Sequence, residues 1–225
     1  MPHLRTINLG SRSLLEKSRG SELEYSTRSM CSYLARHGEI KAPASLLLIE
    51  LVSKMNEVKP PSIADSTLRV RVASSLDELS DFLDSAESDR AAQTISWITK
   101  AFQMAVEHNI FEESALEQLQ QAGERAKQEG YSHIYPTAKP AFTPNRKWSA
   151  TLMLDHGVTE TIGRLQIADR SGQMHSEHEV FRTRPDELMF RMWLVRPKWL
   201  SNTTVEVIPK PWATQCKPFK LDISD

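Results

Sequence analysis

The hydrophobic pattern of this 225-residue chain changes period near residue 130, and that change constrains the fold more than any other feature. Before it, apolar residues recur at steps of three and four, the spacing of amphipathic helices. Pro136, Pro140 and Pro144 then exclude a helix. From Trp148 onward apolar residues tend to alternate, which is typical of strands. The sequence predicts an α+β fold with a helical subdomain over 1–130, a proline-rich connector over 131–147 and an antiparallel β subdomain over 148–225.

The first part predicts a bundle-like portion of about five helices. Pro43 suits a first helical turn, Pro60 ends that helix, and Ser75 with Glu78 forms a capping box for another. The expected helices cover 25–37, the stretch from Pro43 to Pro60, the residues after Ser75, 89–108 and 112–129. An alternating run, 68–72, is expected to be a short edge strand that joins the C-terminal sheet.

The second part predicts a meander of antiparallel strands separated by turn-forming residues. The segment 187–196 is apolar on both faces, apart from Arg191, which indicates a central or helix-covered strand. The segment 174–183 is polar on both faces, which indicates an edge strand or a loop. The expected strands cover 148–154, 159–168, 174–183, 187–196 and 203–208.

The net charge of −1 excludes a polycationic nucleic-acid sleeve and an acidic tail protein. The charge is nevertheless divided. Residues 1–130 hold 15 Lys and Arg against 19 Asp and Glu, a net of −4, whereas residues 131–225 hold 13 against 10, a net of +3. An anionic partner is therefore expected to meet the second half.

The chain is expected to be intracellular and cytoplasmic. Its longest apolar stretch is far shorter than the roughly 18–20 residues of a membrane-spanning helix, and its amino terminus does not read as a secretory signal. Cys31 and Cys216 have no ligand spacing and are expected to be free thiols. Peripheral association with a membrane or a virion is compatible with this expectation.

Basic and aromatic residues lie side by side at three places in the second half. Such pairs can stack on exposed bases or sit at the headgroup layer beside anionic lipid. The alternative is that the tryptophans pack in the core while the cations face water. Arg69 and Arg71 share a face of the run 68–72 and form a weaker candidate for partner binding. The residues of the three basic-aromatic segments are Arg146, Lys147 and Trp148; Arg196, Lys198 and Trp199; Lys210 and Trp212.

Imidazoles and carboxylates that divalent metals use are gathered at His175, Glu177 and His178, with His156 upstream. On a strand, however, His178 would point away from the other two. Neither a phosphate-binding glycine loop nor a nucleophile elbow is present, and glycines total only 8. No cofactor is expected from these patterns.

These observations favour a non-enzymatic interaction or assembly protein that self-associates or binds a macromolecular partner through its surfaces. A matrix-like structural protein of a viral or phage particle, contacting membrane or nucleoprotein, fits this combination. So does an inhibitor or immunity-type binding protein. The alternative is a metal-dependent enzyme that uses His156, His175 and His178 with Glu177 or Asp155.

Overall fold

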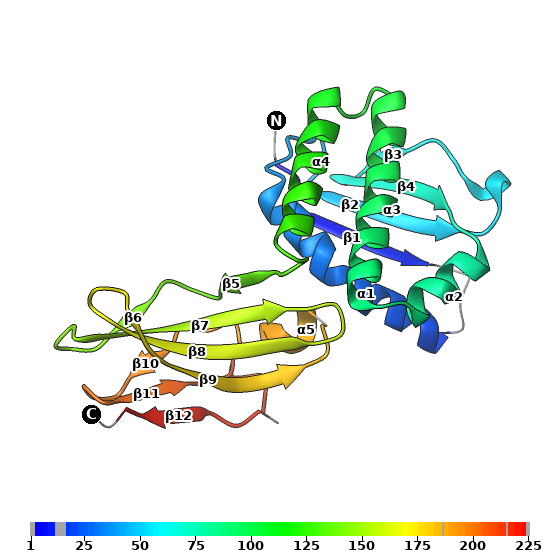
Figure 1. The fold of residues 1–225 in the computed structure, drawn as a ribbon. Coiled ribbons are helices and arrows are strands. Elements are labelled where there is room, and N and C mark those ends of the chain that lie inside the picture. The colour runs from blue at the N-terminus through cyan, green and yellow to red at the C-terminus, as the bar shows by residue number, and fades with distance from the viewer. Residues whose placement is uncertain (1–2, 12–16, 186, 215, 224–225) are drawn as a thin grey trace. The chain divides into compact units, whose positions relative to one another are not determined.

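The computed structural model describes residues 3–11, 17–185, 187–214 and 216–223. Within these ranges the chain forms five α-helices and twelve strands in three sheets (Figure 1). It divides into two compact units, Met1–Ser132 and His133–Asp225. The architecture is broadly α+β, with most of the helices in the first unit and most of the strands in the second.

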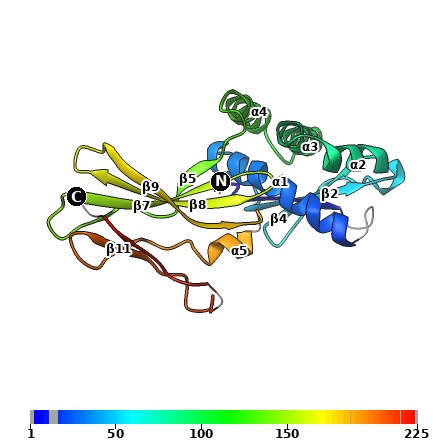
Figure 2. The same cartoon turned by 60° about the horizontal axis from the view of Figure 1, so that its bottom comes forward.

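The N-terminal unit is built on a sheet, so the predicted bundle of helices is wrong. Strands β1, β2 and β4 run parallel in the order β1-β2-β4-β3, and β3 pairs antiparallel with β4. Helices α3 and α4 lie on one side of this sheet (Figure 2). The elements are β1 (Thr6–Ser11), α1 (Lys17–His37), β2 (Leu46–Val52), a 3₁₀ turn (Met55–Glu57), β3 (Ser62–Ala64), β4 (Thr67–Ala73), α2 (Leu76–Asp84), α3 (Glu87–Glu107) and α4 (Glu113–Gln128).

The error arose at Leu46–Val52, where a helix was predicted and the structure has the central strand β2. A short, nearly continuous apolar run fits a buried parallel strand as well as a helix. Its alternate residues Leu47, Ile49 and Leu51 are buried. The run 68–72 lies in β4, so it joins this N-terminal sheet and not the C-terminal one.

The helix signals elsewhere in this unit are confirmed. Ser75 caps α2 by accepting a hydrogen bond from the Glu78 backbone N–H at 3.0 Å. Helix α1 ends at His37, just before Gly38, as expected. In the described part of the chain no helix is both long and apolar enough to cross a bilayer.

The C-terminal unit consists of two antiparallel sheets. The larger has the order β5-β7-β8-β9, with β6 also paired to β7, and the smaller has the order β10-β11-β12. The segment 131–147 contributes two of these strands. The elements are β5 (Ile134–Pro136), β6 (Ala141–Phe142), β7 (Trp148–His156), β8 (Thr161–Asp169), β9 (Met174–Thr183), α5 (Glu187–Arg191), β10 (Lys198–Trp199), β11 (Thr204–Val207) and β12 (Phe219–Asp222).

One face of the larger sheet packs with the smaller sheet into a single hydrophobic core. Leu152, Leu154 and Leu165 contribute from the larger sheet, and Val205 and Val207 from the smaller. Strand β9 lies at the sheet's edge, as its polar pattern predicted. The opposite face of the larger sheet carries polar side chains, so the alternation along β7 and β8 separates core from surface.

The predicted strand 187–196 is wrong. Glu187–Arg191 forms the short helix α5, and Phe190, Met192 and Trp193 enter the core of the C-terminal unit. An apolar run without alternation has no period that distinguishes a strand from a helix followed by a buried loop.

Candidate functional site

Three turns meet at one end of the C-terminal unit. Both views show the β6–β7, β8–β9 and β10–β11 connections at the same end, beside the end of β12 (Figures 1 and 2). We call this surface the loop end and define it as residues 142–148, 168–175 and 198–203. It includes one complete basic-aromatic segment, Arg146 to Trp148, and Lys198 and Trp199 of a second, whose Arg196 lies just outside these ranges.

The β6–β7 turn is held by its own polar side chains. Asn145 Oδ1 accepts hydrogen bonds from Thr143 Oγ1 at 2.8 Å and from the Lys147 backbone N–H at 3.0 Å. Thr143 Oγ1 also accepts from the Trp148 backbone N–H at 3.1 Å. Arg146 takes a left-handed backbone conformation, with φ of 56°. The turn therefore presents Arg146 and Lys147, both exposed, on a defined backbone.

The β8–β9 turn is held in a comparable way, by hydrogen bonds to the side chain of Asp169. Asp169 Oδ1 accepts hydrogen bonds from the backbone N–H groups of Ser171 at 2.8 Å and Gln173 at 2.9 Å, and from Ser171 Oγ at 2.6 Å. Gly172 has a φ of 88°, which favours glycine. The hydrogen bond from Ser171, followed by those from the backbone, lowers the pKa of Asp169 below its usual value. The exposed Arg170 sits on this turn.

Hydrogen bonds join the two sheets at this end. The Asn145 backbone N–H donates to Asn202 Oδ1 at 3.2 Å, and Trp199 Nε1 donates to the Ala141 carbonyl at 2.9 Å. Arg196 Nη2 donates to the Pro140 carbonyl at 2.8 Å. These bonds bring the segment 196–199 next to the β6–β7 turn, although about fifty residues separate them in the chain.

Exposed apolar side chains accompany the cations. Strand pairing places Phe142, Ser149, Ala168 and Met174 in one row across four strands, so their side chains share the outer face of the sheet. Phe142 is 53% exposed, Met174 is 54% exposed, and Leu200 in the β10–β11 turn is 47% exposed. Sequence reasoning missed these three residues, because a single apolar residue at the end of a short or polar strand carries no period.

The loop end holds the positive excess of the C-terminal half. Its residues include four cations against a single carboxylate, Asp169, which gives a net charge of +3. That equals the net charge of residues 131–225 as a whole. The cations are Arg146, Lys147, Arg170 and Lys198.

The two tryptophans of the loop end are partly covered by neighbours. The ring of Trp148 lies 4.7 Å from that of His175 between centroids, and Lys147 Nζ lies 5.1 Å from the Trp148 ring. Trp199 is half-buried against the core. Both indoles therefore help to hold the turns in place, and the exposed apolar contacts belong to other residues.

No known protein family, curated protein or solved structure matches this chain.

The third basic-aromatic segment lies elsewhere. Pairing of Val207 with Phe219 places the stretches 208–214 and 216–218 at the other end of β11 from the turn at Asn202. There the Lys210 backbone N–H donates to the Met192 carbonyl at 2.9 Å, and Trp212 is 54% exposed. Lys210 and Trp212 are therefore separated from the loop end by the length of the strands.

Arg69 and Arg71 lie in the N-terminal unit, on one face of β4 as the alternation predicted. Arg71 Nε donates to Glu50 Oε2 at 3.0 Å, and Arg69 Nη1 lies 3.9 Å from Glu50 Oε1. Their charges are directed in part at a carboxylate of the neighbouring strand. This pairing favours a role within the sheet over one in partner binding.

The structure does not gather the residues of the metal hypothesis. His156 is 1% exposed at the end of β7, whereas His178 pairs with Leu165 on the core side of β9. His175 packs on Trp148, and Glu177 faces the opposite side, where its carboxylate accepts from Gln166 at 2.8 Å. Among the residues that the structure describes, no cluster of three or more His, Cys, Asp or Glu could hold a metal ion.

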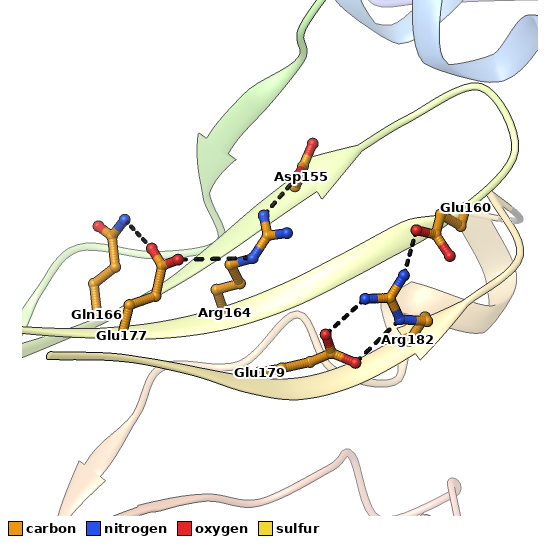
Figure 3. A network of polar contacts seen from close by, with 7 residues as sticks. All are labelled: Asp155, Glu160, Arg164, Gln166, Glu177, Glu179 and Arg182. Carbon is orange, nitrogen blue, oxygen red and sulfur yellow. Dashed lines mark hydrogen bonds and ion pairs between the residues drawn. The ribbon is translucent and has the colours of Figure 1, made fainter. Parts of the chain in front are cut away.

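An ion-pair network covers the outer face of the larger sheet (Figure 3). Arg164 Nη1 donates to Asp155 Oδ2 at 2.6 Å, and its Nε lies 3.7 Å from a Glu177 oxygen. The register across β7, β8 and β9 creates this network, so the sequence alone did not reveal it.

The second half of the network is centred on Arg182. Its guanidinium donates to Glu179 at 2.8 Å and also to Glu160. The hydrogen bond from Arg182 lowers the pKa of Glu179 and raises the pKa of the arginine itself. Across the network four carboxylates face two arginines, so this part of the face is acidic while the loop end is basic.

Proposed function

We propose that this chain is a non-enzymatic binding protein and that its loop end contacts an anionic macromolecular partner. The observation that carries the proposal is the convergence at that end of two basic-aromatic segments with three exposed apolar side chains. Exposed apolar side chains gathered beside cations are typical of interaction surfaces.

The charge of the loop end predicts a binding strength. Each Lys or Arg close to an anionic surface contributes about 1 kcal/mol at moderate ionic strength. Four such cations give weak, salt-dependent attachment, which suits assembly through many copies more than tight capture of one ligand. The structured turns help, since little conformational entropy is lost on contact.

The charge distribution favours an assembly role of the matrix-like kind. Such a protein joins an anionic membrane or nucleoprotein to other copies or partners. An inhibitor or immunity-type protein would instead bind a particular protein, for which the acidic network on the sheet face is the better candidate. The metal-dependent enzyme has less support, because Glu177 lies on the opposite face of the sheet from His178, and His156 and His175 lie near opposite ends of β7.

Binding to immobilised heparin, a general polyanion, tests the proposal. The wild-type protein is expected to be retained at low salt and to elute as the salt concentration rises. The double variant Arg146→Gln/Lys147→Gln is expected to elute at clearly lower salt. The matched control Lys210→Gln/Lys217→Gln removes the same charge at the opposite end and is expected to elute close to wild type.

Two results would contradict the proposal. One is passage of the wild-type protein through the column at low salt without retention. The other is an equal loss of retention in the loop-end variant and its control, which would assign binding to overall charge. Thermal unfolding of each variant shows whether the comparison is made between folded proteins.

A further inference from the structure

We infer that the anionic partner of the loop end is a lipid surface, with the exposed apolar side chains of the loop end entering the headgroup layer while the cations meet lipid phosphates and carboxylates. This inference rests on the proposed function and names the class of partner for the same site. Two observations support it: the chemistry of the exposed residues, and the partial burial of the Trp148 and Trp199 rings.

The exposed apolar residues have the positions that interfacial binding requires. Phe142 is the last residue of β6, Met174 is the first residue of β9 and Leu200 directly follows β10, so all three lie at the loop end, and each is about half exposed. Arg146, Lys147, Arg170 and Lys198 lie on or beside the same connections. Apolar side chains flanked by Lys and Arg bind at the boundary between headgroups and acyl chains of anionic bilayers.

The same end is less suited to single-stranded nucleic acid. Recognition of unpaired bases depends on aromatic faces on which they can stack. Here His175 and Lys147 pack against the Trp148 ring, and Trp199 is half-buried with its Nε1 bonded to Ala141. Of the Phe and Trp residues of the loop end only Phe142, which is 53% exposed, belongs to the exposed class, and the other exposed apolar residues, Met174 and Leu200, are not aromatic.

The acidic network gives the contact a direction. Asp155, Glu160, Glu177 and Glu179 lie along the outer face of the sheet, where they outnumber Arg164 and Arg182. An anionic bilayer repels that face and attracts the loop end, and both effects act within a Debye length of about 8–10 Å. The C-terminal unit is therefore expected to meet the bilayer end-on, through its turns.

Sedimentation with phospholipid vesicles tests the inference on the full chain. Vesicles that contain phosphatidylserine in phosphatidylcholine are expected to bind the protein at low salt, and pure phosphatidylcholine vesicles much more weakly. Each cation near such a surface contributes roughly a fivefold gain in affinity, so Arg146→Gln/Lys147→Gln predicts a loss of about 25-fold. The control Lys210→Gln/Lys217→Gln is expected to change affinity less than twofold.

The apolar contribution is tested separately. Phe142→Ser removes an exposed ring and is expected to fold normally, yet to reduce vesicle binding on the order of tenfold. A second variant, Phe142→Trp, adds a fluorophore at the same position. Because the chain already has five tryptophans, the emission of this variant is compared with that of the wild-type protein, and the additional emission from position 142 is expected to shift to shorter wavelength when anionic vesicles are added, since that indole leaves water.

Three results would overturn the lipid inference: no binding to anionic vesicles, unchanged Phe142→Trp emission in bound protein, or equal losses in the loop-end variant and its control. Two further measurements separate the lipid inference from the proposed function. They are fluorescence anisotropy with single-stranded RNA and retention on the heparin column. Retention on heparin without vesicle binding, with or without binding to RNA, overturns the lipid inference and leaves the proposed function standing. Failure of all three ligands overturns both.

Discussion

Individual polar residues hold the turns of the loop end in shape. Asn145 and Asp169 each accept several hydrogen bonds from their own turns, and neither belonged to the residues that sequence reasoning selected. Of the four cations of the loop end, Arg146, Lys147 and Lys198 were selected from the sequence, whereas Arg170 was not. Residue types thus identified most of the charges, whereas the side chains that position them became visible only with the turn geometry.

The hydrogen bonds that Asp169 accepts predict that the free energy of unfolding depends on pH. Its pKa is lower in the folded chain than the usual 3.8, so the ionised carboxylate stabilises the fold above that pH. This contribution is lost as the pH falls below 3.8 through the lowered folded-state pKa. Asp169→Asn is therefore expected to lower the free energy of unfolding at pH 7 and to differ less from wild type below pH 3.8.

Urea denaturation at pH 7 and in the acid range measures this difference. A gap between the two proteins that stays constant with pH would show that Asp169 does not act through its charge.

Secondary-structure elements were predicted well where one period dominates and poorly where the apolar residues are continuous. Helices α3 and α4 and strands β7 and β8 follow their patterns closely. Leu46–Val52 and the residues after Pro185 were misassigned, because uninterrupted apolar runs fit two structures equally well. The pairing register, and with it the Arg164 and Arg182 network, depends on bulges in β9 that the sequence does not signal.

Packing between β8 and β9 gives a prediction at the scale of the element. Gly163 lies opposite Phe181, and a Cβ there would stand 2.1 Å from the Phe181 ring. That ring also stacks on Trp193, with centroids 5.0 Å apart, so it has little room to move. Gly163→Ala is expected to lower the free energy of unfolding by about 1–3 kcal/mol, as overpacked cores do.

Chemical denaturation checks this value. Gly172→Ala does not serve as a control for this clash. A residue with a Cβ is strained at a φ of 88°, so this substitution would lower the free energy of unfolding without any steric overlap. Unchanged stability of Gly163→Ala would show that the Phe181 ring can leave its place over the glycine.

At the scale of the whole molecule, the net charge of −1 is the sum of an acidic first half and a basic second half. Residues 1–130 carry a net charge of −4, and the +3 of residues 131–225 equals the net charge of the loop end. Sequence alone located that excess in the second half. It could not show that 146–148 and 196–199 meet, or that the segment at 210–212 lies apart from them, because both facts depend on how β10 and β11 turn back toward β6.

Acetylation of lysine side chains in the wild-type protein, with and without a bound polyanion, tests this account most directly. Lys147 and Lys198 are exposed at the loop end, and Lys217 is exposed at the opposite end. Mass spectrometry of the digested protein reports how fast each amine reacts. The account predicts that a bound anionic partner slows acetylation of Lys147 and Lys198 and leaves the rate at Lys217 nearly unchanged. Protection of Lys217 without protection of Lys147 and Lys198 would contradict it.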